Sequence, residues 1–241
     1  MADPSAAPRL YPLGDAAVVL EFGQVIAPAT HQLIQAFARV LAQHPPPGLR
    51  EVVPAFTTLT VYYNPGVLAE LGAASPYEHL ANNLRQLLPL AQAALADTVA
   101  GPLIEIPVCY GGDLGPDLGL VASHAQLTPN EVIARHAQPE YLVYMVGFAP
   151  GFPYLGGLDA RLATPRRAQP RPLVPAGTVG IAGAQTGVYS LPTPGGWQLI
   201  GRTPLRLFDP SRTRPSLLQA GDRLRFVPIT EQEFQRLSNE Y

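Results

Sequence analysis

The stretch TVGIAGAQTGVYSLPTPGGWQLIG, Thr178–Gly201, decides the fold of the second half of the chain. It holds three short runs, TVGIAG, TGVYSL and GWQLIG, which Gly and Pro residues separate. Gly and Pro interrupt helices and mark turns between strands, so each run predicts a short strand. PLRLFD (204–209) and RLRFVPI (223–229) continue the pattern. Several short strands at this spacing are typical of a β-barrel or sandwich.

The first half of the chain has a different pattern. Its elements are predicted to follow the order β-α-β-β-α over residues 9–95, with a strand at 15–22, a helix at 28–43, two strands around Pro54 and a helix that begins at Ser75. This order is typical of an α+β domain. We therefore expect two domains, 1–95 and 96–241, with the strand-rich part in the second.

One helix of the second domain has a complete set of start signals. Thr128 is placed as the N-cap, Pro129 at the first helical position and Glu131 at the capping-box position. Pro139 ends the pattern, and His136 lies near its last turn.

The loop GFAPGFPYLGGL, Gly147–Leu158, combines Gly, Pro and aromatic residues in a way that neither a helix nor a central strand tolerates. It predicts a stiff wall of a binding site or of an interface with another protein; the alternative is a corner that closes the barrel. The loop glycines expected to shape the backbone are Gly147, Gly151, Gly177, Gly195 and Gly196. Trp197 and the strands around it predict a tight hairpin at Gly195–Gly196.

The composition excludes several classes of site. All 16 basic residues among the 241 are Arg, so a P-loop lysine, a Schiff-base lysine and biotin on this chain are impossible. A single Cys excludes a disulfide framework, and no pair of His residues has metal-binding spacing, so we expect no metal site. No apolar run is long enough for a membrane span and no signal peptide is apparent, which favours the cytoplasm.

Charge is distributed unevenly along the chain. Residues 160–230 carry ten Arg and two acidic residues, whereas residues 1–159 carry five Arg and thirteen acidic residues. Arginine clusters bind carboxylates and phosphates, because the planar guanidinium matches their geometry. The segment lacks the interleaved aromatic residues of a nucleic-acid stacking platform, so we expect a small anion rather than nucleic acid.

The candidate site residues come from the loops. We expect an anion-binding set of four arginines, Arg166, Arg167, Arg171 and Arg202. Gln185 and Thr186 are predicted to hydrogen-bond a substrate, and His136 or Asp117 to orient it or shuttle a proton, with His136 titrating near neutral pH. The structural alternatives remain open: Arg202 pairs with Asp209, and His136 caps its helix.

At these loops the chain resembles a known family. GGDLGPDL, GFAPGFPYLGGL, TPRRAQPRPLVPAGTVGIAG, QTGVYSLPTPGGW, IGRTPLRLFDP and AGDRLRFVPI occur in the order seen in the B subunits (PxpB) of bacterial ATP-dependent 5-oxoprolinases. The same family is also called allophanate hydrolase subunit 1 and the KipI-type histidine kinase inhibitors. The chain is similar as well to half of the carboxyltransferase domain of urea carboxylase. GDAAVVLEFG and GLREVVPAFTTLTVYYNPG extend the resemblance to nearly the whole chain.

The resemblance implies an N-terminal ferredoxin-like α/β domain and a C-terminal cyclophilin-like β-barrel. It also implies two partner proteins, PxpA and PxpC, which act with this chain to open 5-oxoproline to glutamate at the cost of ATP. In this view ATP, with Mg²⁺, is held mainly by PxpC, and this chain supplies half of the site.

Three other functions stay open at this point. The family name of kinase inhibitor implies a binding protein without catalysis. Carboxyl transfer needs a biotin-bearing lysine on a partner. Allophanate hydrolysis follows from the older family name alone.

Overall fold

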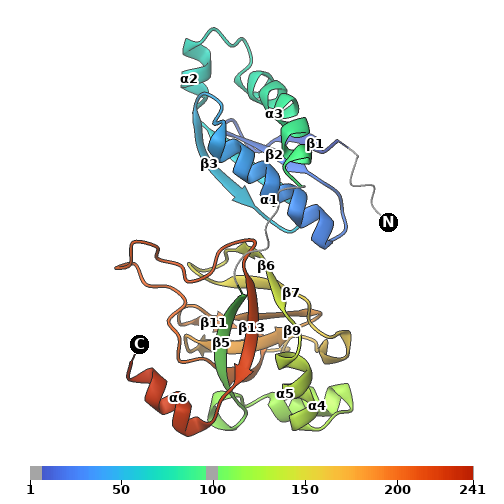
Figure 1. The fold of residues 1–241 in the computed structure, drawn as a ribbon, viewed down its shortest axis with the longest axis vertical. Coiled ribbons are helices and arrows are strands. Elements are labelled where there is room, and N and C mark those ends of the chain that lie inside the picture. The colour runs from blue at the N-terminus through green and yellow to red at the C-terminus, as the bar shows by residue number, and fades with distance from the viewer. Residues whose placement is uncertain (1–6, 96–102, 241) are drawn as a thin grey trace. The chain divides into compact units, whose positions relative to one another are not determined.

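The computed structural model describes residues 7–95 and 103–240. The chain divides into two compact units, Met1–Val99 and Ala100–Tyr241 (Figure 1). The expected boundary between residues 95 and 96 falls at the start of a stretch outside the described residues.

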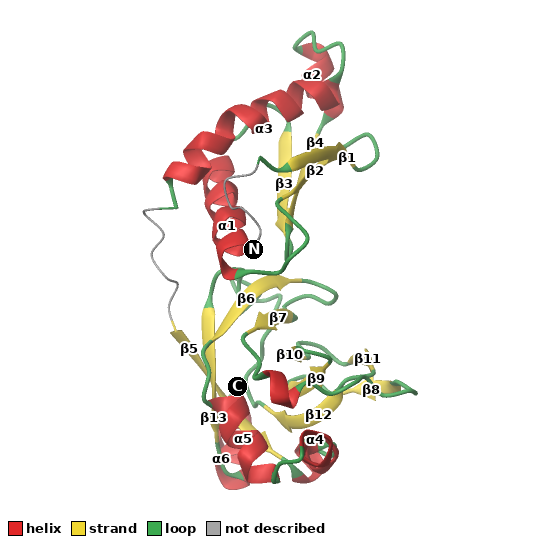
Figure 2. Ribbon diagram, turned by 90° about the vertical axis from the view of Figure 1, so that its right-hand side faces the viewer, coloured by secondary structure: helices red, strands yellow, loops and turns green. Residues whose placement is uncertain are grey.

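The N-terminal unit is a four-stranded antiparallel sheet with helices packed on one face (Figure 2). Its elements are β1 (Arg9–Pro12), β2 (Ala17–Glu21), α1 (Pro28–Gln43), β3 (Leu49–Pro54), β4 (Thr58–Tyr63), α2 (Pro65–Glu70) and α3 (Pro76–Ala93). The strand order is β1-β2-β4-β3, so β4 lies between the two strands that α1 connects. Apolar side chains of α1, α3, β2 and β4 form its core.

The predicted β-α-β-β-α order is confirmed by β2, α1, β3, β4 and α3, but the prediction did not include β1 and α2. β1 pairs along its whole length with β2, from Arg9 opposite Glu21 to Pro12 opposite Val18. Helix α3 begins as predicted, because the Ser75 side chain accepts a hydrogen bond from the Glu78 N–H at 3.3 Å.

The C-terminal unit is a closed barrel of seven strands. Around the barrel the order is β10-β7-β6-β13-β5-β12-β9. The strands are β5 (Leu103–Tyr110), β6 (Tyr141–Val146), β7 (Pro153–Gly156), β9 (Thr178–Ala182), β10 (Gln185–Val188), β12 (Gln198–Arg202) and β13 (Arg223–Pro228). The sequence left a barrel and a sandwich open, and the structure has the barrel.

The first and last strands of the barrel pair in parallel. Residues Leu103–Val108 of β5 lie opposite Arg223–Pro228 of β13, whereas the other described ladders of the barrel are antiparallel. Helices α4 (Leu118–Ala125) and α5 (Pro129–Ala137) lie together at one end of the barrel, and α6 (Glu231–Ser238) contacts β5 (Figures 1 and 2). Two short 3-10 helices, η1 (Gly112–Leu114) and η2 (Ala160–Leu162), complete the unit.

A two-stranded sheet, β8 (Arg171–Val174) with β11 (Thr193–Gly195), lies beside the barrel. In Figure 2 it occupies the side of the barrel opposite β5 and β13. Neither strand is evident from the sequence, because Pro172 and Pro194 interrupt them.

Three local predictions are wrong. Residues 204–209 form no strand; Phe208 makes a single isolated bridge with Ser216. Gly195 and Gly196 do not join a hairpin, because β11 pairs with β8 whereas β12 pairs with β9 and β5. The loop Gly147–Leu158 contains a barrel strand, β7, so it is a loop only in part.

Candidate functional site

The four predicted arginines lie around β8 and β12 but differ in what they contact. Arg166 and Arg167 precede β8, Arg171 begins β8, and Arg202 ends β12. Arg166 is exposed and makes no hydrogen bond or ion pair with any described residue. The other three make contacts with neighbouring loops.

Asp117 forms ion pairs with two of these arginines. Its Oδ1 accepts a hydrogen bond from Arg171 Nη2 at 2.8 Å and a longer one from Arg167 Nη1 at 3.4 Å. Its Oδ2 accepts the backbone N–H of Leu199 at 2.7 Å. The carboxylate is buried, with a side-chain exposure of 7%. Asp117 therefore joins the start of α4 to β12 and β8, and all its contacts are internal to the protein.

The cluster around Asp117 holds two cations and one anion. Arg167 Nε and Arg171 Nη1 are both buried and have no hydrogen-bond partner among the described residues. Unpaired guanidinium donors of this kind favour an additional anionic or carbonyl oxygen. The cluster thus keeps a net positive charge after Asp117 is counted.

Arg202 contacts the backbone rather than an acid. Its Nε donates to the Ala176 carbonyl at 2.8 Å, and burial lowers the pKa of the guanidinium. It lies between two cavities of about 220 and 240 Å³. The alternative that Arg202 pairs with Asp209 is wrong: Asp209 pairs with Arg206 at 3.6 Å and Arg212 at 3.5 Å.

His136 and Thr186 lie in the barrel interior. His136 Nδ1 is 2.8 Å from the Tyr110 hydroxyl, and its Nε2 is 2.9 Å from Thr186 Oγ1, which in turn donates to the Gly180 carbonyl at 3.0 Å. The imidazole also stacks on Phe226, with ring centroids 4.5 Å apart.

Burial lowers the pKa of His136 to about 3, so the imidazole is neutral at neutral pH. This corrects two expectations: His136 does not titrate near neutral pH, and it packs into the barrel instead of capping its helix. Thr186 is fully buried, so it cannot contact a substrate at the surface. Gln185, half-buried at the start of β10, remains accessible.

Three of the five predicted loop glycines have a clear structural reason. Gly177 and Gly151 adopt positive φ values of 81° and 76°, and a Cβ on Gly177 would lie 2.4 Å from the Thr203 carbonyl oxygen. A Cβ on Gly195 would lie 2.3 Å from the Tyr189 hydroxyl. At Gly147 and Gly196 a Cβ would meet only ordinary contacts.

The loop Gly147–Leu158 lines an aromatic cavity beside β11, whose other walls are not evident from the sequence. Phe152 lies at the centre of its wall, with Tyr154 at 5.0 Å, Tyr189 at 5.6 Å and Trp197 at 5.6 Å between ring centroids. The cavity has a volume of about 370 Å³, and Arg166 is the one charged residue among the described residues that line it. The signal was present in the aromatic residues of GFAPGFPYLGGL and QTGVYSLPTPGGW, but their convergence depends on the barrel.

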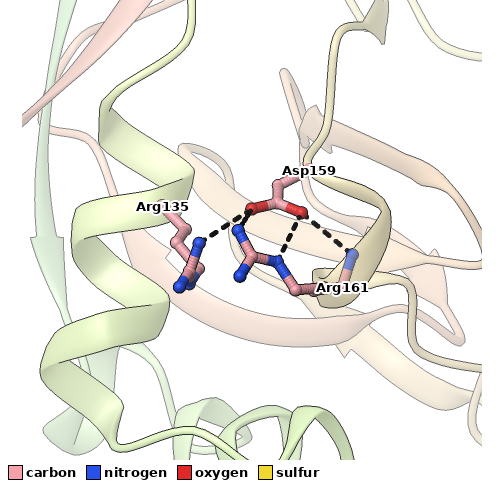
Figure 3. Close-up of polar contacts among 3 residues, drawn as sticks. All are labelled: Arg135, Asp159 and Arg161. Atoms are coloured by element: carbon pink, nitrogen blue, oxygen red, sulfur yellow. Dashed lines mark hydrogen bonds and ion pairs between the residues drawn. The ribbon is translucent and has the colours of Figure 1, made fainter.

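A second polar cluster, also not predicted, lies at the end of α5 (Figure 3). Asp159 accepts hydrogen bonds from Arg135 at 3.3 Å and from the backbone and guanidinium of Arg161. Arg135 and Asp159 border a cavity of about 400 Å³. The cluster connects α5 to η2, and the Asp159 oxygens are occupied by internal donors.

Within residues 7–95 and 103–240, no group of three or more His, Cys, Asp or Glu side chains is placed to hold a metal ion. In the same residues, no helix combines the length and apolar character that crossing a bilayer requires.

Comparison with known proteins places the chain in a family. Residues 8–218 match the family described as "Carboxyltransferase domain, subdomain C and D". The chain is 49% identical over 231 residues to the B subunit of 5-oxoprolinase from Bacillus subtilis, covering 95% of both chains. It is 47% identical over 224 residues to the B subunit of 5-oxoprolinase from Escherichia coli O157:H7, covering 92% of this chain and 97% of the relative.

Solved structures agree with this placement. The crystal structure of TTHA0988 matches with a TM-score of 0.73 at 38% identity, covering 89% of this chain and 40% of the longer chain. The Kluyveromyces lactis urea amidolyase matches with a TM-score of 0.71 over 97% of this chain and 16% of its own, and its 18% identity supports the fold alone. The chain belongs to the family of 5-oxoprolinase B subunits, within the wider group that shares subdomains C and D of the carboxyltransferase domain.

Proposed function

We propose that this chain is the B subunit of an ATP-dependent 5-oxoprolinase, which acts in the cytoplasm with PxpA and PxpC to convert 5-oxo-L-proline to L-glutamate. The observation that carries the proposal is the 44–49% identity to three relatives named as B subunits of 5-oxoprolinase, over at least 91% of this chain and 95% of each relative. The names ferredoxin-like and cyclophilin-like for the two units belong to the same proposal.

The chemistry of ring opening explains why several cations are useful here. A lactam carbonyl is a poor electrophile, and phosphorylation of its oxygen by ATP creates a good leaving group. That step places negative charge on phosphoryl oxygens, which fixed guanidinium groups stabilise. The pair at Asp117 and Arg202 supply such groups, and Arg166 supplies a further, exposed guanidinium.

The arginines of this chain fit a substrate carboxylate or a single phosphoryl group better than a whole nucleotide. Arg167 and Arg171 share their charge with Asp117, and Arg202 donates its Nε to a backbone carbonyl. The chain also has no lysine for a P-loop. We therefore propose that ATP and Mg²⁺ are held mainly by PxpC and that PxpA completes ring opening.

Reconstitution tests this function. The purified chain is mixed with its cognate PxpA and PxpC, and glutamate release from 5-oxo-L-proline is followed with and without ATP. The expected result is glutamate only when this chain and ATP are both present. Equal turnover when this chain is left out would overturn the proposal and favour a binding role, such as kinase inhibition.

A further inference from the structure

The aromatic cavity beside β11 has the character of a small-molecule site. Its volume of about 370 Å³ lies in the range of about 300–1,000 Å³ that ligand sites occupy. Residues of β7, of β11 and of the neighbouring loops form it, with Phe148, Phe152, Tyr154, Tyr189 and Trp197 as the aromatic lining. Aromatic faces of this kind bind flat rings by stacking and edge contacts.

The charge of the cavity limits its ligand. Arg166 lines it and makes no hydrogen bond or ion pair with any described residue. A cationic ligand would be repelled by this guanidinium, although aromatic walls alone would favour one. A triphosphate carries more negative charge than one arginine balances. One carboxylate on a flat, otherwise neutral ring matches the lining.

Phe148 at the rim supports a binding role. It is 68% exposed and adopts a φ of 68°, a left-handed conformation that is strained for a bulky residue. Its ring lies edge-on to Phe152, with centroids 5.6 Å apart. Backbone strain in a bulky residue recurs at ligand sites, where the surrounding structure holds it. The loop here is held by hydrogen bonds from Gly147 N–H to the Phe152 carbonyl and from Ser190 Oγ to the Pro150 carbonyl.

The cavity also contains a hydroxyl donor. Burial raises the pKa of Tyr189, so its hydroxyl is protonated at neutral pH. Its oxygen already interacts with the Trp197 backbone, and its side chain lies near Arg166 and Arg171. A protonated phenol in an aromatic wall is suited to donate to an amide carbonyl.

We propose that this cavity binds the ring of a small cyclic amide against its aromatic wall, while Arg166 binds the ring's carboxylate. The inference rests on the proposed function, because that function supplies the ligand, 5-oxo-L-proline. It assigns the substrate-binding subsite to this chain and gives Arg166 a different role from the three other arginines. Phe148 covers the open side of the ring.

Trp197 allows a direct test, because it lines the cavity and is the sole tryptophan of the chain. The full chain is titrated with 5-oxo-L-proline and with 2-pyrrolidinone, the same ring without a carboxylate, while Trp197 fluorescence is recorded. The variants are Arg166→Gln and, as a matched control, Arg236→Gln, an exposed arginine on α6. Arg166 is exposed and makes no hydrogen bond or ion pair with any described residue, so its replacement is expected to leave the fold intact, which urea unfolding checks.

The expected result is a saturable change in Trp197 fluorescence with 5-oxo-L-proline. 2-Pyrrolidinone is expected to bind at least about tenfold more weakly, because it lacks one charge-assisted contact. Arg166→Gln removes that difference, and Arg236→Gln keeps it. Absence of a saturable change in the native chain, or native affinity in Arg166→Gln, overturns the proposal.

The reconstituted enzyme separates the two proposals. In the active complex with PxpA and PxpC, Arg166→Gln is expected to raise the KM for 5-oxo-L-proline at least about tenfold, with little change in kcat. Turnover with an unchanged KM in Arg166→Gln rejects the subsite and leaves the proposed function in place. Carboxylate-dependent binding without any turnover rejects the function and leaves the subsite in place.

Discussion

Replacement of Asp117 by Asn distinguishes a structural carboxylate from a catalytic one. Asn keeps the shape of the side chain and can still accept the Leu199 N–H with its amide oxygen. It removes the negative charge that faces Arg171 at 2.8 Å and Arg167 at 3.4 Å.

The expected loss of stability follows from these contacts. The Arg171 contact is short and charge-assisted, so its loss costs about 1.5–3 kcal/mol. The Arg167 contact is long and its side chain is 35% exposed, so it adds at most about 0.5 kcal/mol. Removal of one partner of a fully buried pair costs about 3–5 kcal/mol, but Arg171 is 23% exposed and retains some hydration. We expect a decrease of about 2–3 kcal/mol in the free energy of unfolding.

The assay is urea unfolding followed by Trp197 fluorescence, which reports on the barrel because Trp197 is the sole tryptophan. With an m-value of about 2 kcal/mol per molar urea, the midpoint falls by about 1–1.5 M. Asp113→Asn is the matched control, since Asp113 lies on the same segment, is exposed and has no described partner. An unchanged midpoint together with lost turnover in the reconstituted enzyme would refute the structural role and restore Asp117 as a catalytic group.

Three further predictions concern the barrel. Because burial lowers the pKa of His136 to about 3 in the folded state, the unfolded chain binds more protons between about pH 3 and 6.5. His136 therefore makes stability fall as pH decreases through this window, by up to about 1.4 kcal/mol per pH unit, and His136→Gln is expected to make the profile measured by urea unfolding less steep. Gly195→Ala is expected to displace the Tyr189 hydroxyl and cost about 1–3 kcal/mol, whereas Gly196→Ala, which meets only ordinary contacts, stays within about 0.5 kcal/mol; equal midpoints for the two variants would contradict this. Thr128→Ala removes a complete capping box and should lower the thermal stability of the barrel by about 1 kcal/mol, with Ser123→Ala on α4 as the comparison.

The elements that could be predicted from the sequence are those whose signals are local. The helix that begins at Thr128 and the strand at Thr178–Ala182 were found because capping residues and apolar runs specify them within a few positions. β8 was missed because Pro172 lies inside it, although the edge position of the strand accommodates a proline. The run at 204–209 has the composition of a strand, but no described neighbour extends a ladder along it.

The candidate site was less predictable because it depends on distant residues. Arg167, Arg171 and Arg202 were chosen for their charge, and nothing in the sequence indicates that Asp117 lies within 3.5 Å of two of them. The position of His136 near the end of its helix predicts titration near neutral pH, but Tyr110 and Phe226, from the first and last barrel strands, help to bury it. The aromatic cavity arises in the same way from residues that converge only in the folded barrel.

The parallel ladder between β5 and β13 affects how the chain folds during translation. More than 110 residues separate the end of β5 from the start of β13. At about 5–20 residues per second, a ribosome takes on the order of ten seconds to synthesise them. During that time the edge of β5 that pairs with β13 has no partner strand, and the other edge has none until β12 is made. The apolar side chains Ile106 and Val108 also lack Phe226 and Leu224 to pack against. Long-range pairing of this kind slows folding and exposes nascent chains to aggregation. The barrel is therefore expected to close only after translation is nearly complete, and a nascent chain stalled before Arg223 should depend on chaperones.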